Sequence, residues 1–208
     1  MDDFAIASLS KAVSAMEGGA FDEEIVPVTV SGRGGDTVVS ADEQPPKAKP
    51  EKIPSLKPAF AKDGSVTAAN SSSISDGASA LVLASESAAT AAGATPIARI
   101  VAHASHAQLP AEFTLAPIGA INKVLDKAGW SKDDVDLFEI NEAFAVVTLL
   151  AIQELGLDAD KVNVHGGACA LGHPIGSSGS RILVTLIHAL KQRGLKRGIA
   201  SLCIGGGE

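Results

Sequence analysis

Apolar and polar residues recur along the chain with two different periods, and each period predicts a type of secondary structure. Apolar residues spaced three and four apart predict amphipathic helices, which we expect at 3–16, 117–128, 142–155 and 178–193. Short apolar runs and strict alternation predict strands, which we expect at 24–30, 135–140 and 199–204. A glycine-rich turn at 31–36 is expected to join the first of these strands to Val38 and Val39 as a hairpin. Strands that alternate with helices predict a layered α/β fold.

The middle of the chain has a weaker pattern. Residues 41–63 contain five prolines and little apolar content, which indicates a loop or linker. The continuous apolar run at 80–84 predicts a strand buried on both faces. A short alanine-rich helix over 85–93 and another strand over 97–101 are expected to follow it.

The composition indicates how the core is built and which kinds of partner can be excluded. The chain has 208 residues with 46% hydrophobic and 20% charged side chains, ordinary values for a globular protein, but only 3% aromatic residues. The core must therefore be built from Ala, Val, Leu and Ile. A formal net charge of −7 argues against a nucleic-acid partner, because binding phosphates needs a basic surface.

Nothing in the sequence predicts a membrane or secreted protein. No apolar stretch reaches the roughly 20 residues that span a bilayer, and the N-terminus lacks the basic region of a signal peptide. The two cysteines, Cys169 and Cys203, are too few for a disulfide framework. We therefore expect a reducing, cytoplasmic location and no membrane partner.

A glycine-rich run at 166–179 is the most informative local feature of the chain. It contains five glycines, one proline and one histidine in fourteen residues, and it leads into the last predicted helix. Glycine is used where the backbone must turn sharply or approach another group closely. The histidine held between glycine and proline, His173, is therefore expected to have a fixed position.

Two further motifs carry candidate catalytic side chains at the ends of predicted strands. Asn141 opens the segment Asn-Glu-Ala-Phe-Ala directly after one strand, and Cys203 opens Cys-Ile-Gly-Gly-Gly at the end of the last one. Asn141, His173 and Cys203 together predict an active site. A glycine-rich turn normally reverses into another strand, but the sequence stops at Glu208, so we expect a final strand to be missing.

These motifs resemble the C-terminal part of the thiolases, the family that makes and cleaves 3-oxoacyl-CoA thioesters. The segments at 141–145, 172–174 and 203–207 resemble three thiolase motifs in the family's order and at about its spacing. A fourth resemblance is the segment 67–72 followed by 76–78, which is similar to the family's coenzyme A contact segment.

The resemblance implies a thiolase-like layered α/β fold with a mixed five-stranded sheet, of which this chain is the C-terminal half. Residues 1–75 would be the remnant of a loop domain that carries the coenzyme A contact segment. Residues 76–96 would be the last strand and helix of the N-terminal thiolase domain. Residues 97–208 would be the C-terminal thiolase domain lacking its final strand.

The resemblance also implies a role for each candidate residue. Cys203 would exchange a proton with the methyl carbon of CoA-bound acetyl, for which its pKa must be drawn toward neutrality. His173 would activate a nucleophilic cysteine and donate to the thioester oxyanion. Asn141 would donate in the same oxyanion hole or hold a water there, and the Gly205 N–H would serve a second oxyanion hole.

Each of these features also has a purely structural interpretation. Cys203 would be a buried cysteine at a strand end, and His173 a hydrogen-bonded loop histidine. Asn141 would be the N-cap of the following helix. The helix start at 177–179 would either bind an anion or simply cap the helix.

Four further residues would line the path of the pantetheine and thioester by resemblance: Ala68, Ser72, Ala143 and Phe144. For Ala143 and Phe144, ordinary helix packing is an equal alternative. No metal-ligand spacing and no phosphate-binding GxxxxGK[ST] pattern occur in the sequence. We therefore expect no metal and no cofactor, with coenzyme A thioesters as substrates.

The resemblance implies an acyltransferase reaction, the reversible Claisen condensation of two acetyl-CoA to acetoacetyl-CoA plus CoA through an acyl-cysteine. Thiolases carry that nucleophilic cysteine in an N-terminal half without counterpart in this sequence, and Cys169 lies in the wrong motif to replace it. Two alternatives stay open. One is an inactive fragment or C-terminal partner half that binds only CoA or another chain, and the other is a thiolase for longer 3-oxoacyl chains.

Acyl-CoA thioesters are the expected small-molecule substrates. The segment 163–167 and the tail 203–207 favour the short-chain biosynthetic group of thiolases. A complete thiolase would form a homo-oligomer, a tetramer in the family, whereas this chain would need a complementary N-terminal thiolase half.

Overall fold

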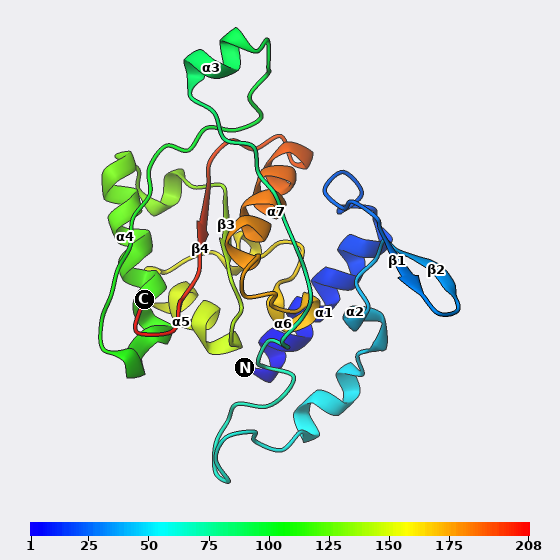
Figure 1. Cartoon of the computed structure of the whole chain (residues 1–208). Helices are drawn as coiled ribbons and strands as arrows, with labels where there is room; N and C mark the ends of the chain where they lie inside the picture. Colours follow the sequence, from blue (N-terminus) through cyan, green and yellow to red (C-terminus); the bar gives the residue numbers. More distant parts are fainter.

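A two-stranded parallel sheet lies at the centre of the computed structural model, which describes residues 1–208. Strand β3 (Leu137–Ile140) pairs along its whole length with β4 (Gly198–Ser201). Val162 forms a parallel bridge with Phe138, so β3 has an extended neighbour on each side. Figure 1 shows the two strands surrounded by helices α4, α5 and α7. Of the mixed five-stranded sheet that the resemblance implies, the structure contains these two parallel strands.

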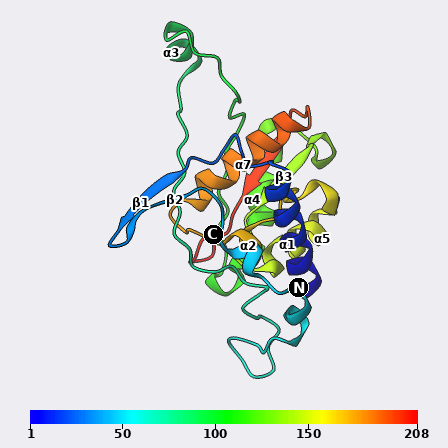
Figure 2. The ribbon, with the colours of Figure 1, turned by 90° about the vertical axis from the view of Figure 1, so that its right-hand side faces the viewer.

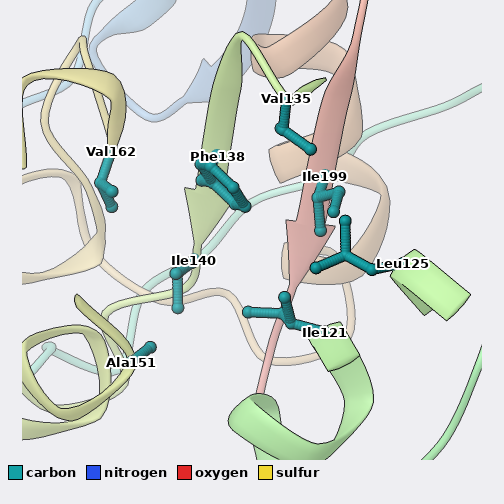
Figure 3. Packing of buried hydrophobic residues seen from close by; sticks show 8 residues of the cluster. All are labelled: Ile121, Leu125, Val135, Phe138, Ile140, Ala151, Val162 and Ile199. Carbon is teal, nitrogen blue, oxygen red and sulfur yellow. The ribbon is translucent and has the colours of Figure 1, made fainter. Parts of the chain in front are cut away.

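Successive side chains of β3 point to opposite sides of the sheet, as expected for a strand. One side packs against α4 (Ala116–Ala128) and α5 (Ala145–Leu155). Figure 3 shows the buried cluster on this side, which consists of Ile121, Leu125, Val135, Phe138, Ile140, Ala151, Val162 and Ile199. On the other side, Leu137 packs with Leu186 and Ala189 of α7 (Ser178–Gln192). The sheet therefore lies between two layers of helices, which confirms the layered α/β prediction.

A smaller core joins the N-terminal helix to the glycine-rich region. Helix α1 (Asp2–Glu17) packs against α6 (Ala168–Leu171), the short helix α2 (Gln44–Lys47) and the 3-10 helix η1 (Pro50–Ser55). The buried residues of this core are Leu9, Ala12, Ile53 and Ala170. This packing fixes the start of the glycine-rich run relative to α1.

The predicted hairpin is confirmed as an element that projects from the body of the molecule. Strands β1 (Val28–Gly32) and β2 (Gly35–Val39) are antiparallel, and all their residues are exposed. Figure 2 shows the hairpin extending away from the helices. Short 3-10 helices lie in three connecting loops: η2 (Pro110–Leu115), η3 (Lys132–Asp134) and η4 (Ala159–Lys161).

The other predicted elements are present with changed boundaries. The helices expected at 3–16, 117–128 and 178–193 are confirmed. The helix expected from residue 142 begins only at Ala145, and α6 is an additional helix that no periodicity predicted. No helix in the structure combines the length and the apolar character needed to cross a membrane.

The strands predicted at 80–84 and 97–101 are wrong for this structure. Both segments pair with no neighbouring strand, and Val82 is 100% and Ile97 77% exposed. An apolar run becomes a buried strand only where a neighbouring strand and covering helices are present, and this part of the chain has neither. Between the two segments, α3 (Glu86–Ala91) projects from the body, as Figures 1 and 2 show.

Candidate active site

Two of the residues predicted to be catalytic, Asn141 and Cys203, lie at one edge of the sheet. Asn141 directly follows β3, and Cys203 comes shortly after the end of β4. The Asn141 N–H donates to the carbonyl of Ser201 at 2.9 Å, which extends the parallel ladder to Asn141. Because parallel strands end at the same edge of a sheet, the two motifs meet at its carboxyl edge, where open α/β sheets bind ligands.

Asn141 is not the N-cap of the following helix, so that structural interpretation is wrong. Helix α5 begins at Ala145, after Phe144. Asn141 Nδ2 instead lies 3.4 Å from His173 Nε2, while Asn141 Oδ1 is buried without a hydrogen-bond partner. Buried polar atoms are nearly always hydrogen-bonded, so this free oxygen fits the predicted role of holding a water.

His173 is held by its backbone and by both ring nitrogens. Its N–H donates to the carbonyl of Ser73 at 3.0 Å, and its Nδ1 lies 2.6 Å from Ser178 Oγ. Its Nε2 faces the Asn141 amide. Burial, and secondarily the nearby Arg181 guanidinium, lower the pKa of His173. The imidazole is therefore neutral at neutral pH and can accept a proton, as expected for a histidine in a fixed position.

Cys203 differs from the prediction in one respect. The side chain is buried, with 7% of its surface exposed, and burial raises the pKa of its thiol. The expected shift of this pKa toward neutrality is therefore contradicted. A raised pKa keeps the thiol protonated at neutral pH, which favours proton donation in the cleavage direction over proton removal in the synthetic direction.

The tail after Cys203 leaves a backbone donor free. Gly205 is an exposed residue, and its N–H makes no hydrogen bond within the chain. The Gln108 N–H donates to the carbonyl of Gly207 at 2.9 Å, which ties the tail to the segment before η2. The donor predicted for a second oxyanion hole is thus available.

The segment that resembles a coenzyme A contact lies directly against the residues after Asn141. Ser72 donates through both its N–H and its Oγ to the carbonyl of Ala143, at 3.0 and 2.9 Å. The Ala145 N–H donates to the carbonyl of Asn70 at 2.9 Å. The structure therefore brings two of the predicted lining residues, Ser72 and Ala143, next to the predicted catalytic asparagine.

The other two predicted lining residues lie nearby. The ring of Phe144 packs edge-on against Phe60 and Phe113, with centroid distances of 6.3 and 6.1 Å. Ala68 is exposed in the turn that precedes Ser72. The binding roles of Ala68, Ser72, Ala143 and Phe144 stay predictions.

Glu142 is a buried carboxylate that links three segments of the chain, and it was not among the candidate residues identified from the motifs. It accepts hydrogen bonds from Ser8 Oγ at 2.7 Å, Asn163 Nδ2 at 2.9 Å and the Cys169 N–H at 3.1 Å. Burial raises the pKa of Glu142, and these hydrogen bonds oppose that shift. Gly167 passes so close that a Cβ there would collide with the carboxylate. Glu142 therefore fixes the position of the glycine-rich run relative to Asn141, which directly precedes Glu142 in the sequence.

Asn163 completes the hydrogen bonding of β3 at its last residue. Its Oδ1 accepts from the Ile140 N–H and its Nδ2 donates to the Ile140 carbonyl, both at 2.8 Å. Its backbone has φ 46°, a left-handed conformation that asparagine tolerates better than most residues. The amide thus takes the place of a neighbouring strand and fixes the position from which Asn141 projects.

A second group of buried ionisable side chains lies around Arg181 of α7. Glu139 Oε1 and Arg181 Nη1 are buried without hydrogen-bond partners. Burial raises the pKa of Glu139 to about 8 and that of Glu24 to about 7, although Arg181 lowers both. Glu139 is therefore largely protonated at neutral pH.

Glu139→Gln is expected to remove a pH dependence of stability. The unfolded chain loses this proton near pH 4.5, whereas the folded chain keeps it up to about pH 8. Stability from Glu139 is therefore complete below pH 4.5, falls as the pH rises from there, and is fully lost once the pH passes about 8, on the order of 5 kcal/mol in total. Urea unfolding at pH 5 and pH 8 should show this loss in the parent chain and less of it in the variant.

The matched control for this measurement is Glu154→Gln on the exposed face of α5. It should leave the difference between the two pH values unchanged. Equal pH dependence in Glu139→Gln and in the parent chain would contradict the assignment of the proton to Glu139.

The start of α7 is not capped by a serine side chain. Ser177 occupies the N-cap position without a side-chain cap hydrogen bond, and its hydroxyl lies 2.7 Å from Ser79 Oγ. The capping interpretation of 177–179 is therefore wrong for Ser177, and anion binding there stays a prediction. An open pocket of about 360 Å³ lies beside this turn, lined by residues 75–79 and 174–177.

These features define an α/β protein with a histidine–asparagine pair and a buried thiol at the carboxyl edge of a parallel sheet. The family model described as the N-terminal domain of thiolase matches residues 1–87, and the one described as the C-terminal domain matches residues 94–208. The chain belongs to the thiolase family. The finer division into 1–75, 76–96 and 97–208 stays a prediction.

Known relatives agree with this assignment. The chain is 53% identical over 207 residues to a probable acetyl-CoA acetyltransferase of Dictyostelium discoideum, covering 99% of this chain and 50% of that protein. It is 52% identical over 208 residues to the acetyl-CoA acetyltransferase of Escherichia coli, covering 100% and 53%. The chain thus spans about half the length of the curated relatives that it matches.

Solved structures confirm the thiolase-like α/β fold. The crystal structure of the Bacillus anthracis acetyl-CoA acetyltransferase matches with a TM-score of 0.96 at 51% identity, covering 99% of this chain and 52% of that one. The crystal structure of human mitochondrial 3-ketoacyl-CoA thiolase matches with a TM-score of 0.91 at 41% identity and the same coverage.

Proposed function

We propose that this chain forms the acid–base part of an acetyl-CoA acetyltransferase site. Such an enzyme joins two acetyl-CoA into acetoacetyl-CoA and CoA, and it catalyses the reverse cleavage. The observation that carries the proposal is the contact of His173 Nε2 with the Asn141 amide, 3.4 Å apart, at the sheet edge where the Cys203 motif begins. These groups can accept a proton, donate to an oxyanion and exchange a proton with a carbon acid.

A complementary N-terminal thiolase half, on the same polypeptide or on a second one, supplies the nucleophilic cysteine. The proposal is supported by the family resemblance and by the coverage of 50% and 53% of two relatives. Cys169 does not replace this nucleophile. Its thiol donates to the carbonyl of Glu142 at 3.7 Å, and burial raises its pKa, which disfavours the reactive thiolate.

Cleavage of acetoacetyl-CoA begins with a proton transfer from the nucleophilic thiol to His173 Nε2. The resulting thiolate attacks the 3-keto carbonyl, and the Gly205 N–H donates to the oxyanion that forms. The C2–C3 bond then breaks, and its electron pair passes to C2. Cys203 Sγ–H protonates this carbon, which yields acetyl-CoA and leaves acetyl on the nucleophile. His173 Nε2–H and the Asn141 amide stabilise the enolate oxygen during this step.

The second half of the reaction transfers acetyl to CoA. The CoA thiol gives its proton to the Cys203 thiolate and attacks the acetyl-cysteine, which releases the second acetyl-CoA. The departing cysteine thiolate recovers its proton from His173. Synthesis follows the same steps in reverse, with the Cys203 thiolate removing a proton from the acetyl methyl group. The proposed steps use no cofactor apart from the coenzyme A thioesters themselves.

The acetyl group is the preferred acyl substrate in this proposal. The chain is 52% and 51% identical to the acetyl-CoA acetyltransferases of Escherichia coli and Bacillus anthracis, but 41% identical to the human 3-ketoacyl-CoA thiolase. Comparing thiolysis of acetoacetyl-CoA with that of a longer 3-oxoacyl-CoA distinguishes the two specificities. Faster cleavage of the longer substrate would favour the alternative.

Thiolysis of acetoacetyl-CoA, followed as loss of the enolate absorbance, tests the proposal. We expect no turnover by the 208-residue chain alone. We expect turnover by the complemented enzyme, which is this chain co-expressed with the N-terminal half of the Escherichia coli acetyl-CoA acetyltransferase. Absence of turnover from a complex that forms and still binds CoA by calorimetry would favour a chain that only binds CoA. Turnover by the chain alone would contradict the need for a nucleophilic cysteine from the N-terminal half.

A further inference from the structure

We infer that Ser178 is a positioning residue, which fixes the tautomer of His173 so that an unprotonated Nε2 faces the site. The inference rests on the proposed function, since it concerns the atom of His173 that exchanges the proton. Ser178 is the first residue of α7, and none of its surface is exposed. The Ser178 N–H donates to the carbonyl of Pro174 at 2.9 Å, and this turn brings the serine back to the imidazole.

The hydrogen bonds of the Ser178 hydroxyl leave it one role toward His173. A hydroxyl has a single proton to donate and two lone pairs with which to accept. Ser178 Oγ lies 3.1 Å from the carbonyl oxygen of Pro174, which can only accept, so the hydroxyl proton points there. His173 Nδ1 lies 2.6 Å from the same Oγ. Ser178 therefore accepts from His173, and Nδ1 carries the ring proton of the neutral imidazole.

The Asn141 amide, in the orientation that it has in the structure, agrees with the same tautomer from the opposite side of the ring. Its Nδ2 group, 3.4 Å from His173 Nε2, is a donor only. A protonated Nε2 would face another donor, whereas an unprotonated Nε2 accepts. The contact from the start of α7 thus places the lone pair at Nε2, and the contact from the residue after β3 agrees with it.

This arrangement prepares His173 for the proton that it receives. When Nε2 takes a proton, the ring becomes an imidazolium and its Nδ1–H donates more strongly to Ser178, because hydrogen bonds from charged donors are stronger. Catalytic bases are commonly oriented by a third group in this way. Ser178 touches neither substrate nor nucleophile in the proposed reaction, so its effect reaches the chemistry through His173.

The tautomer can be measured without any activity. A correlation spectrum of the imidazole rings in nitrogen-labelled chain distinguishes a protonated Nδ1 from a protonated Nε2. The signals of His173 are those that vanish in His173→Gln. We expect Nδ1–H in the parent chain and a mixture of tautomers in Ser178→Ala. Ser178→Thr keeps the hydroxyl and should restore the parent spectrum.

The same variants have an expected kinetic effect in the complemented enzyme. Ser178→Ala should lower kcat by roughly 10- to 100-fold, a part of the 10²–10⁴ that a positioned acid–base group contributes, with KM little changed. The acid limb of the kcat–pH profile of this variant should move to lower pH, because the His173 imidazolium loses Ser178 as a hydrogen-bond acceptor. Ser180→Ala is the matched control, since its hydroxyl contacts Ser79 and the carbonyl of Ser177 rather than His173.

The outcomes separate this inference from the proposed function. A protonated Nε2 in the parent chain would overturn the inference even where Ser178→Ala fails to fold. An unchanged spectrum and rate in a folded Ser178→Ala would overturn it as well. The expected Nδ1–H tautomer in a complemented enzyme without thiolysis would count against the proposed function and leave the assignment of the ring proton intact.

Discussion

Replacing Cys203 by serine in the complemented enzyme is expected to lower the rate of acetoacetyl-CoA thiolysis by roughly 10²–10⁴-fold, the contribution of a positioned general acid or base. Serine keeps the size of the side chain but is a far weaker acid than a thiol. The C2 carbanion would then lack its proton donor when the carbon–carbon bond breaks. Steady-state thiolysis at saturating acetoacetyl-CoA measures this effect.

Cys169→Ser is the matched control, because it makes the same change at the other cysteine of the chain. We expect it to leave the rate near that of the parent enzyme, since the Cys169 thiol is bonded to a backbone carbonyl. Loss of activity in Cys169→Ser together with a normal rate in Cys203→Ser would reverse the assignment. Unchanged unfolding curves in both variants would show that the comparison concerns chemistry rather than folding.

Glu142→Ala is expected to destabilise the chain by about 3–5 kcal/mol, because three neutral donors lose their acceptor and each unsatisfied buried donor costs about 1–3 kcal/mol. The change leaves three donors, from Ser8, Asn163 and Cys169, without their acceptor. A loss of this size is a large fraction of the roughly 5–15 kcal/mol that stabilises most domains. Urea unfolding at pH 7 measures it, and a lowered thermal midpoint should accompany it.

Two smaller changes test the same network in case Glu142→Ala does not fold. Ser8→Ala removes one donor to Glu142 and the acceptor of the Gly167 N–H, so it should cost about 2 kcal/mol, the typical contribution of two hydrogen bonds. Glu142→Gln keeps one acceptor oxygen but presents an amide donor to other donors, so its cost should lie between those of the two alanine variants. A stability in Glu142→Gln equal to that of the parent chain would show that the carboxylate is not what the three donors require.

The helices were predictable because their signals are local. Apolar spacing in α4 and α7 and the glycine that ends α4 act within a few residues, and no distant contact is needed to recognise them. Strands were less predictable, because a strand exists only through its partner. The run at 80–84 has the composition of a buried strand, yet it lies exposed and unpaired in this structure.

In the candidate site, too, some residues could be predicted from local sequence and others could not. Asn141, His173 and Cys203 could be identified from motifs at predicted strand and loop ends, and the structure brings Asn141 and His173 into contact. Their supports could not be identified. Ser8 and Glu142 are 134 positions apart in sequence, and nothing in either neighbourhood indicates that they share a hydrogen bond.

The order of motifs, the periods of the apolar residues and the family membership are therefore properties that can be read along the chain, because each depends on residues close to one another. The buried carboxylate at Glu142, the raised pKa of Cys203 and the proton position on His173 depend on burial and on hydrogen bonds between distant segments. Those contacts form only when the sheet, α1 and α7 pack together. Folding thus gives the chemical properties to side chains whose identities the sequence already shows.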